Sequence, residues 1–285
     1  MKLDMPPSLA PFHHSSTSIR RRSGLAKVSA RLVSANDSEL AETEGRRGAA
    51  IAVVIANRLQ LRILESGGIR DIAVHIVLGI DCDGAKTILG IGGPTALHAE
   101  LGGIHARTAF AAVADTLEMS DTLRDVFGPL SVQTSIAALV RQCVVQASGG
   151  QRPALSAALR SVYRAPDIAA ARAALDRFAL SRWGQRYPSI VTAWNRNWTG
   201  LSAYFEFPPA VRRFLETADA VESFFEKLRR RAIALPNAFP SEEAALRTLQ
   251  SHGRRLSSGW KVAPRKWQPA KAHFQALLAG QERFR

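Results

Sequence analysis

Short apolar runs and turn signals alternate through the middle of this chain of 285 residues. Val- and Ile-rich runs of strand length, separated by Gly-containing turns, occur at 49–64, 71–80 and 86–91. Strands joined by such short turns predict an antiparallel meander. Helical and strand patterns then alternate up to about Val145, so the order of elements predicts a mixed α/β sheet.

The pattern after residue 147 is Ala-rich and helical, which predicts an all-helical insertion over residues 147–207. Three of the five tryptophans lie there, and we expect them to anchor a small core of the insertion's own: Trp183, Trp194 and Trp198. Pro208 then opens one long predicted helix, whose apolar residues recur at steps of one, three and four.

Glu222 stands out in that predicted helix because the spacing places it on or beside the apolar stripe. A buried carboxylate is costly unless it is paired or bound to a metal ion. The alternative is a glutamate at the border of the stripe that reaches solvent. Spacing alone does not decide between the two.

Both ends of the chain are basic. Residues 1–47 are rich in Ser, Pro and Arg and have no sustained period, which predicts a disordered segment. A helix is predicted over 241–256, followed by a tail in which Trp260 and Trp267 lie among Lys and Arg. Such a tail suits contact with nucleic acid, although its aromatic residues are equally suited to be core anchors.

The net charge of the chain is +14, and residues 211–285 carry 15 Lys and Arg against 7 Asp and Glu, a net +8. This excess predicts a polyanionic partner, most often nucleic acid; the alternative is a merely basic surface. Cys82 and Cys143 form no zinc or disulfide pattern and fit a reducing cytoplasm, with Cys143 expected in the core. No apolar run is long enough to span a bilayer, so no membrane partner is expected.

Several stretches match, in order, the motifs of one protein family. The most specific is residues 194–223, WNRNWTGLSAYFEFPPAVRRFLETADAVES, where the family reads W-x-x-N-W-x-x-L, F-x-F-P-x-x-I-R and T-N-A-I-E-S. Further matches occur at 75–90, 126–142, 183–190 and 239–247. The chain therefore resembles the Mutator-type transposases of bacterial insertion sequences, from about residue 48 to the C-terminus.

The resemblance implies an RNase H-like core in two parts, 48–146 and 208–285, interrupted by the helical insertion. It also implies two-metal cleavage and transfer of DNA strands, in which three carboxylates hold two Mg²⁺ or Mn²⁺ ions about 3.5–4 Å apart. The implied partners are the terminal inverted repeats of an insertion element, target DNA and a second copy of the chain in a homodimer. The implied location is the bacterial cytoplasm, in association with the nucleoid.

The three catalytic and metal-binding positions that the resemblance implies are only partly kept. Asn57 occupies the first, where a neutral amide can ligate a cation but adds no negative charge. Arg58 beside it is expected to point the other way in a strand. Asp115 takes the second position if one following residue is deleted, whereas an ungapped alignment places Ala114 there. Glu222 takes the third position without a gap.

Other family positions also differ. Thr116 replaces a glycine, which is expected to tighten a turn, and Ser135 and Ala138 replace a Cys and His pair. The family's N-terminal DNA-binding region has no visible counterpart in residues 1–45. The basic residues expected to contact DNA are Arg141, Arg229, Arg230, Arg265 and Lys266. The departures predict a transposase with weak or absent activity; the alternatives are a DNA-binding remnant that never catalyses and an unrelated basic α/β protein.

Overall fold

The computed structural model describes residues 50–102, 109–128, 130–216, 219–233, 238–260, 262–263 and 266–282, all within one compact unit of the chain, 36–285. The side chains of 219–220, 222, 233 and 281–282 are not described. The predicted disordered segment, 1–47, and Arg265 lie outside the described residues.

A mixed sheet of five strands forms the centre of the described residues, in the order β3-β2-β1-β4-β5. The strands are β1 (Ile51–Glu65), β2 (Gly68–Asp81), β3 (Lys86–Gly92), β4 (Ala109–Ala114) and β5 (Ser131–Thr134). β1 to β3 pair antiparallel, whereas β4 runs parallel to both β1 and β5. The predicted meander and the predicted mixed α/β class are therefore confirmed.

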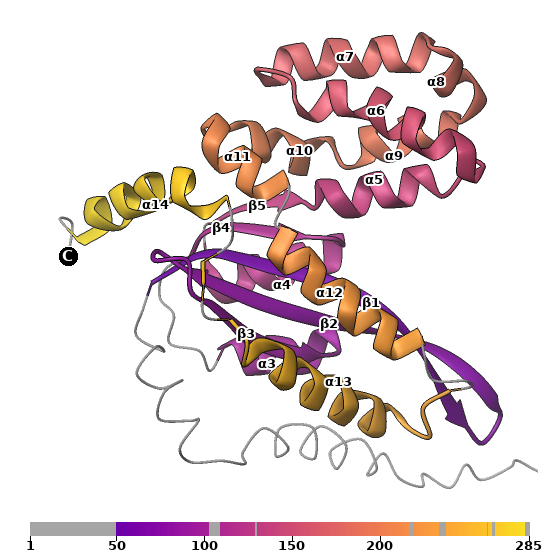
Figure 1. Cartoon of the computed structure of the whole chain (residues 1–285), viewed down its shortest axis with the longest axis vertical. Coiled ribbons are helices and arrows are strands. Elements are labelled where there is room, and N and C mark those ends of the chain that lie inside the picture. Colours follow the sequence, from indigo (N-terminus) through magenta and orange to yellow (C-terminus); the bar gives the residue numbers. More distant parts are fainter. Residues whose placement is uncertain are drawn as a thin grey trace, which may run out of the picture. The chain divides into compact units, whose positions relative to one another are not determined.

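The two faces of the sheet bury different sets of side chains. Alternate residues of β1 point to opposite faces, so Val53 and Ile55 belong to one buried cluster and Val54 and Ala56 to another. The second cluster includes side chains of α3 (Pro94–Gly102) and α4 (Leu117–Phe127). The first includes side chains of α12 (Asp219–Ile233) and α13 (Glu242–Ser257), which lie across the sheet in Figure 1.

β1 and β2 form a long hairpin that continues well past the pairing of β1 with β4, which covers only Ile51 to Ile55. Near the tip of the hairpin an isolated parallel bridge joins Ile63 to Phe239. The Leu64 amide donates to the Phe239 carbonyl at 2.7 Å, and the Phe239 amide donates to the Arg62 carbonyl at 2.8 Å. The segment between α12 and α13 is thereby fixed to β1.

The residues between β5 and Pro209 are helical, as predicted. The elements are α5 (Ile136–Val144), a 3₁₀ turn (Gly149–Gln151), α6 (Arg152–Tyr163), α7 (Ile168–Leu180), α8 (Arg182–Arg186), α9 (Pro188–Arg196) and α10 (Trp198–Phe205). Figure 1 shows them grouped beyond the β5 edge of the sheet. Trp183 and Trp194 are buried, and Trp198 is half-buried.

The expectation that these helices have a core of their own is wrong. Their buried side chains belong to the same cluster as the α12 face of the sheet. Gly200 of α10 explains part of this continuity, because a Cβ there would lie 2.3 Å from Thr134 Oγ1 and 2.9 Å from the Thr134 amide. The missing side chain lets α10 pack directly on β5.

Where the sequence predicts a single long helix from Pro208, the structure describes two helical stretches. α11 (Pro209–Glu216) precedes α12, and residues 217–218 lie outside the described residues. Buried Arg212 of α11 donates to the carbonyls of Ala165 at 3.0 Å and Pro166 at 2.8 Å, and Arg164 forms an ion pair with Glu216 at 2.7 Å. These bonds hold α11 against the helical segment, whereas α12 packs on β1.

The C-terminal tail forms α14 (Trp267–Glu282). Trp267 and Phe274 are completely buried and stack with ring centroids 5.3 Å apart, and Trp267 also meets Phe214 edge-on at 5.0 Å. These two aromatic residues of the tail are therefore core anchors, the second of the predicted roles. Across the described residues, no helix is both long and apolar enough to cross a membrane.

Candidate functional site

Asn57 and Asp115 lie side by side at the end of the parallel part of the sheet. Ile55 of β1 is level with Val113 of β4, so extending this register by two residues sets Asn57 level with Asp115. The Arg58 amide donates to Asp115 Oδ2 at 2.7 Å, which fixes the carboxylate against β1. Asn57 is buried and Arg58 exposed, which confirms that Arg58 points the other way.

The Asp115 carboxylate is short of partners. Its second oxygen, Oδ1, is buried and accepts no hydrogen bond from the described residues. Burial raises the pKa of Asp115, while the hydrogen bond from the Arg58 amide and the charges of Arg58 and Arg141 oppose that rise. A buried anion with a free lone pair is a site that a cation would stabilise.

Thr116 does not distort the turn after β4. Its backbone is extended, with φ −136°, and its side chain caps α4 by accepting a hydrogen bond from the Met119 amide at 3.2 Å. Threonine is a favourable residue at a helix N-cap, and any residue adopts this φ. The expected tightening is therefore wrong, because this turn requires no positive φ.

Ser135 and Ala138, at the positions where the resemblance implies a Cys and a His, form the start of α5. The Ser135 hydroxyl accepts a hydrogen bond from the Ala138 amide at 3.2 Å and so caps the helix. The Ser135 amide donates to the Ala114 carbonyl at 2.8 Å, which places this helix start next to Asp115. The residues beside Asp115 therefore form the cap of a helix, where the resemblance implies the side chains of a Cys and a His.

Glu222 lies on α12, the helix that packs on the face of the sheet carrying Asn57 and Asp115. Val221, Phe225 and Leu228 of this helix are buried in that packing. The side chain of Glu222 is not described, so the convergence of the three residues stays a prediction. The described side chains alone contain no group of three His, Cys, Asp or Glu that could hold a metal ion.

The basic residues expected to contact DNA differ in their surroundings. Arg141 of α5 is near enough to Asp115 to affect the pKa of its carboxyl group, a placement that the sequence did not predict. Arg229 is partly buried and paired with Glu226, whereas Arg230 is exposed. Lys266 and Arg141 each interact with other groups of the protein.

The chain matches the family model "Transposase, Mutator family" over residues 22–263, a range that includes Asn57, Asp115 and Glu222. The chain belongs to the Mutator family of transposases. The match begins at residue 22, so the expectation that similarity is negligible before residue 48 is wrong. A family model adds up many weakly matching positions, and such similarity produces no motif that can be recognised by inspection.

The similarity to three curated relatives agrees with this family assignment. The chain is 35% identical over 241 residues to the "Probable transposase for insertion sequence element ISRM3-like" of Sinorhizobium fredii and to the "Transposase for insertion sequence element ISRM3" of Rhizobium meliloti, with 81% of this chain and 60% of each relative covered. It is 33% identical over 206 residues to a "Probable transposase for insertion sequence element" of Corynebacterium diphtheriae, covering 69% of this chain and 60% of that protein. The chain thus spans about 60% of the length of these relatives.

Proposed function

We propose that this protein is a transposase that binds the end sequences of an insertion element and cuts and joins DNA strands with divalent metal ions, and that its activity is impaired. The observation that carries the proposal is the half-buried Asp115 carboxylate just after β4, which is bonded to the Arg58 amide beside Asn57 and has a buried, unpartnered Oδ1. The proposed partners are the terminal inverted repeats, target DNA and a second copy of the chain.

We also propose that the sheet is an RNase H-like core. The support is the order β3-β2-β1-β4-β5, with an antiparallel meander followed by two parallel strands. In this arrangement β1 is central, and its residue 57 lies next to the end of β4. The helix bearing Glu222 covers the same face, which favours a site built from these elements.

The proposed ligands of two Mg²⁺ or Mn²⁺ ions are Asn57, Asp115 and Glu222. The unpartnered Oδ1 of Asp115 fits a hard cation, and the Asn57 amide offers a neutral oxygen in a buried position. Bound there, the ions would supply Lewis-acid activation and neutralise charge on the phosphate.

Two arginines are proposed to orient the Asp115 carboxylate and the DNA phosphate. The Arg58 amide orients Asp115 through its hydrogen bond, so the other carboxylate oxygen stays available. Arg141 lies near this carboxylate and is suited to hold a DNA phosphate beside it, because a guanidinium can donate two parallel hydrogen bonds to phosphate. Asn57 brings no negative charge, and losing one electrostatic contact of this kind typically costs about 10²–10³ in rate.

The test is cleavage and strand transfer with Mg²⁺ or Mn²⁺ on DNA carrying candidate terminal repeats. Four proteins are compared: the wild type and Asn57→Asp, each with and without Glu222→Gln. We expect Asn57→Asp to bind Mg²⁺ more tightly, as measured by calorimetry, and to cleave faster than the wild type. We expect incomplete restoration, because Ser135 and Ala138 still replace the family's Cys and His.

The matched control is Asn195→Asp, which adds the same charge at an exposed position of α9. Tighter Mg²⁺ binding by this control would show a non-specific charge effect. Robust wild-type cleavage that Glu222→Gln abolishes would support the site and overturn the impairment. If no protein cleaves but all bind the DNA, the second candidate holds: a DNA-binding remnant, favoured by the neutral Asn57.

A further inference from the structure

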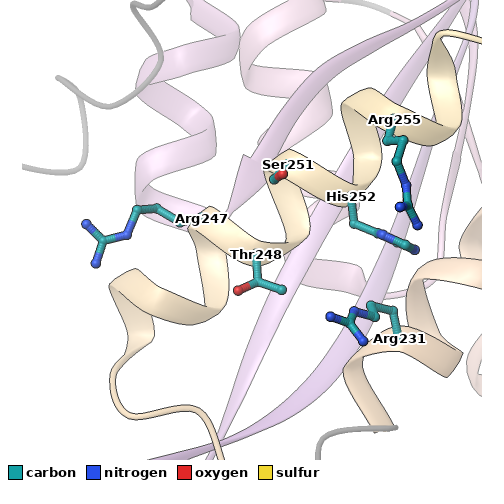
Figure 2. Close-up of a pocket in the computed structure, with 6 residues that line it drawn as sticks. All are labelled: Arg231, Arg247, Thr248, Ser251, His252 and Arg255. Carbon is teal, nitrogen blue, oxygen red and sulfur yellow. The ribbon is translucent and has the colours of Figure 1, made fainter.

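An open pocket of about 470 Å³ lies between α12 and α13, and the described residues that line it are all basic or hydroxyl-bearing. Arg231 comes from the end of α12 and the others come from α13: Arg247, Thr248, Ser251, His252 and Arg255. In Figure 2 the His252 ring lies between the side chains of Arg231 and Arg255, whereas Arg247 points away from them. The pocket therefore contains a group of three cationic or protonatable side chains from two helices.

The spacing of residues on α13 explains why these side chains gather. Thr248, Ser251, His252 and Arg255 follow one another at steps of three, one and three, which places them on one face of a helix. The neighbouring face of α13, with Ala245, Leu249 and Gly253, is buried. A Cβ at Gly253 would lie 3.3 Å from Cδ1 of both Ile88 and Ile91, so the glycine keeps α13 close to β3. The polar face lies beside this buried face, where Arg231 of α12 also lines the pocket.

Among the described residues that line this pocket, none is acidic, so the lining supplies no counterion for its positive charge. Arg247 is paired with Glu243 at 3.1 Å, but Arg231 and Arg255 both act on His252, and their charges lower its pKa together with burial, which is the larger cause. A group of like charges held together in this way is relieved by an anion.

We infer that this pocket binds a backbone phosphate of the DNA, held between Arg231 and Arg255 with His252 beneath it. Phosphate suits the site because guanidinium groups match its oxygens with two hydrogen bonds each. The inference rests on the proposed function, since DNA is the polyanion that a transposase handles.

The pocket also has a defined position relative to the proposed acidic site. Arg231 lies nine residues after Glu222 on α12, which corresponds to about 14 Å along the helix axis. Residues nine apart on an α-helix point to opposite sides of it, so the pocket and Glu222 lie on opposite sides of α12. The pocket would therefore hold DNA at a site separate from the proposed metal ligands.

The sequence pointed to Arg229 and Arg230 and missed Arg231, although all three are adjacent. The signal that could have found the pocket is the polar repeat at 248, 251, 252 and 255 on α13. Its meaning depends on which helix faces it, and only the tertiary structure brings Arg231 there.

The test measures binding of the full chain to a fluorescein-labelled DNA duplex by anisotropy over a range of salt concentrations. The double variant Arg231→Gln/Arg255→Gln is compared with Arg177→Gln/Arg254→Gln, which removes the same number of charges at exposed positions of α7 and α13. We expect the first variant to lower the magnitude of the slope of log K against log salt by about 0.9, the contribution of one phosphate. The control should change the slope less.

Each outcome decides the matter. Equal losses in the two variants, or no loss in the first, would overturn the pocket while leaving DNA binding intact. Failure of the wild type to bind DNA at low salt would instead overturn the proposed function.

A second experiment adds inorganic phosphate at matched ionic strength, to separate a site for small anions from a site for DNA. If phosphate binds in the wild type but Arg231→Gln/Arg255→Gln leaves DNA binding unchanged, the inference of a DNA contact is wrong. Circular dichroism confirms folding, which should persist because both arginines are exposed.

Discussion

The ionisation of Asp115 has a consequence for the stability of the fold. Its pKa is raised by burial, so the folded protein binds this proton more tightly than the unfolded chain does. Above the folded-state pKa the carboxylate is ionised and destabilises the fold; below the unfolded value of about 3.8 both states are protonated and the effect disappears. A bound divalent cation would offset this cost.

Asp115→Asn is therefore expected to stabilise the metal-free protein at neutral pH, by on the order of 1 kcal/mol, and to abolish stabilisation by Mg²⁺. The measurement is urea denaturation at several pH values with and without Mg²⁺. The gain should shrink as the pH falls toward 4. Asp121→Asn, at an exposed position of α4, is the control and should change stability by less than about 0.5 kcal/mol. A destabilised Asp115→Asn would contradict the idea that ionised Asp115 is costly.

His75 is a second buried ionisable residue, on β2 level with Arg58. Neither ring nitrogen has a hydrogen-bond partner among the described residues. Burial, and then the charge of Arg58, lowers the pKa of His75 from 6.5 to about 4. The unfolded chain therefore binds more protons than the folded protein between these two pH values, so stability falls as the pH drops through that window.

His75→Leu is expected to remove this acid sensitivity. The difference in pKa corresponds to about 3 kcal/mol of unfolding free energy lost by the wild type between pH 6.5 and 4. Denaturation of both proteins across this range tests the expectation. His252→Leu is the control, since that imidazole is only partly covered. Parallel stability curves for the wild type and His75→Leu would show that His75 is not the residue responsible.

At the level of single residues, the sequence predicted what depends on local alternation. Buried Asn57 and exposed Arg58 follow from the strand period of two. The hydrogen bond from Arg58 to Asp115 depends on the register of β1 against β4, which no local pattern contains. The extended, unstrained backbone of Thr116 likewise depends on its role as the N-cap of α4.

At the level of elements, α14 is docked through the turn between β2 and β3. Gly84 in this turn has φ +88°, and a Cβ there would lie 2.4 Å from Trp267 Cδ1 and 2.7 Å from Ala263 Cβ. An ion pair from Lys271 to Asp83, at 2.9 Å, adds to the contact. The turn therefore requires glycine both for its backbone conformation and for space.

Gly84→Ala is expected to destabilise the protein by about 3 kcal/mol, because backbone strain and overpacking act together. Gly68→Ala separates the two effects, since Gly68 has φ +126° but open space around its Cβ position. It should cost about 1–2 kcal/mol. Urea denaturation gives both values, and hydrogen exchange should show that only Gly84→Ala loosens α14. Equal effects of the two substitutions would refute the tight contact with Trp267.

Most elements were predicted because their apolar period and their caps are local. Ser241 begins α13 as expected, and its side chain accepts from the Ala244 amide at 3.1 Å. The apolar spacing that predicted one helix from Pro208 continues across residues 217–218, which lie between the described helices α11 and α12. Arg212 and Glu216, which hold α11 in place, find their partners about 50 residues earlier in the chain.

At the level of the whole molecule, the helical segment and the sheet share one buried cluster. The sequence predicted the helices but assigned them a separate core, because tryptophans that are close in sequence suggest a local cluster. Close packing of Gly200 on Thr134 joins the two instead.

The bridge between Ile63 and Phe239 has a consequence for synthesis of the protein. Apart from this bridge, residues 56–65 of β1 pair only with β2 among the described residues, so one edge of the strand has a single distant partner. That partner lies 176 positions later in the chain. A ribosome adding about 5–20 residues per second reaches Phe239 roughly 10–35 s after Ile63. During this interval the hairpin edge is open to pairing with other nascent chains. The rate of translation, as well as the final stability, should therefore determine how much folded protein a cell obtains.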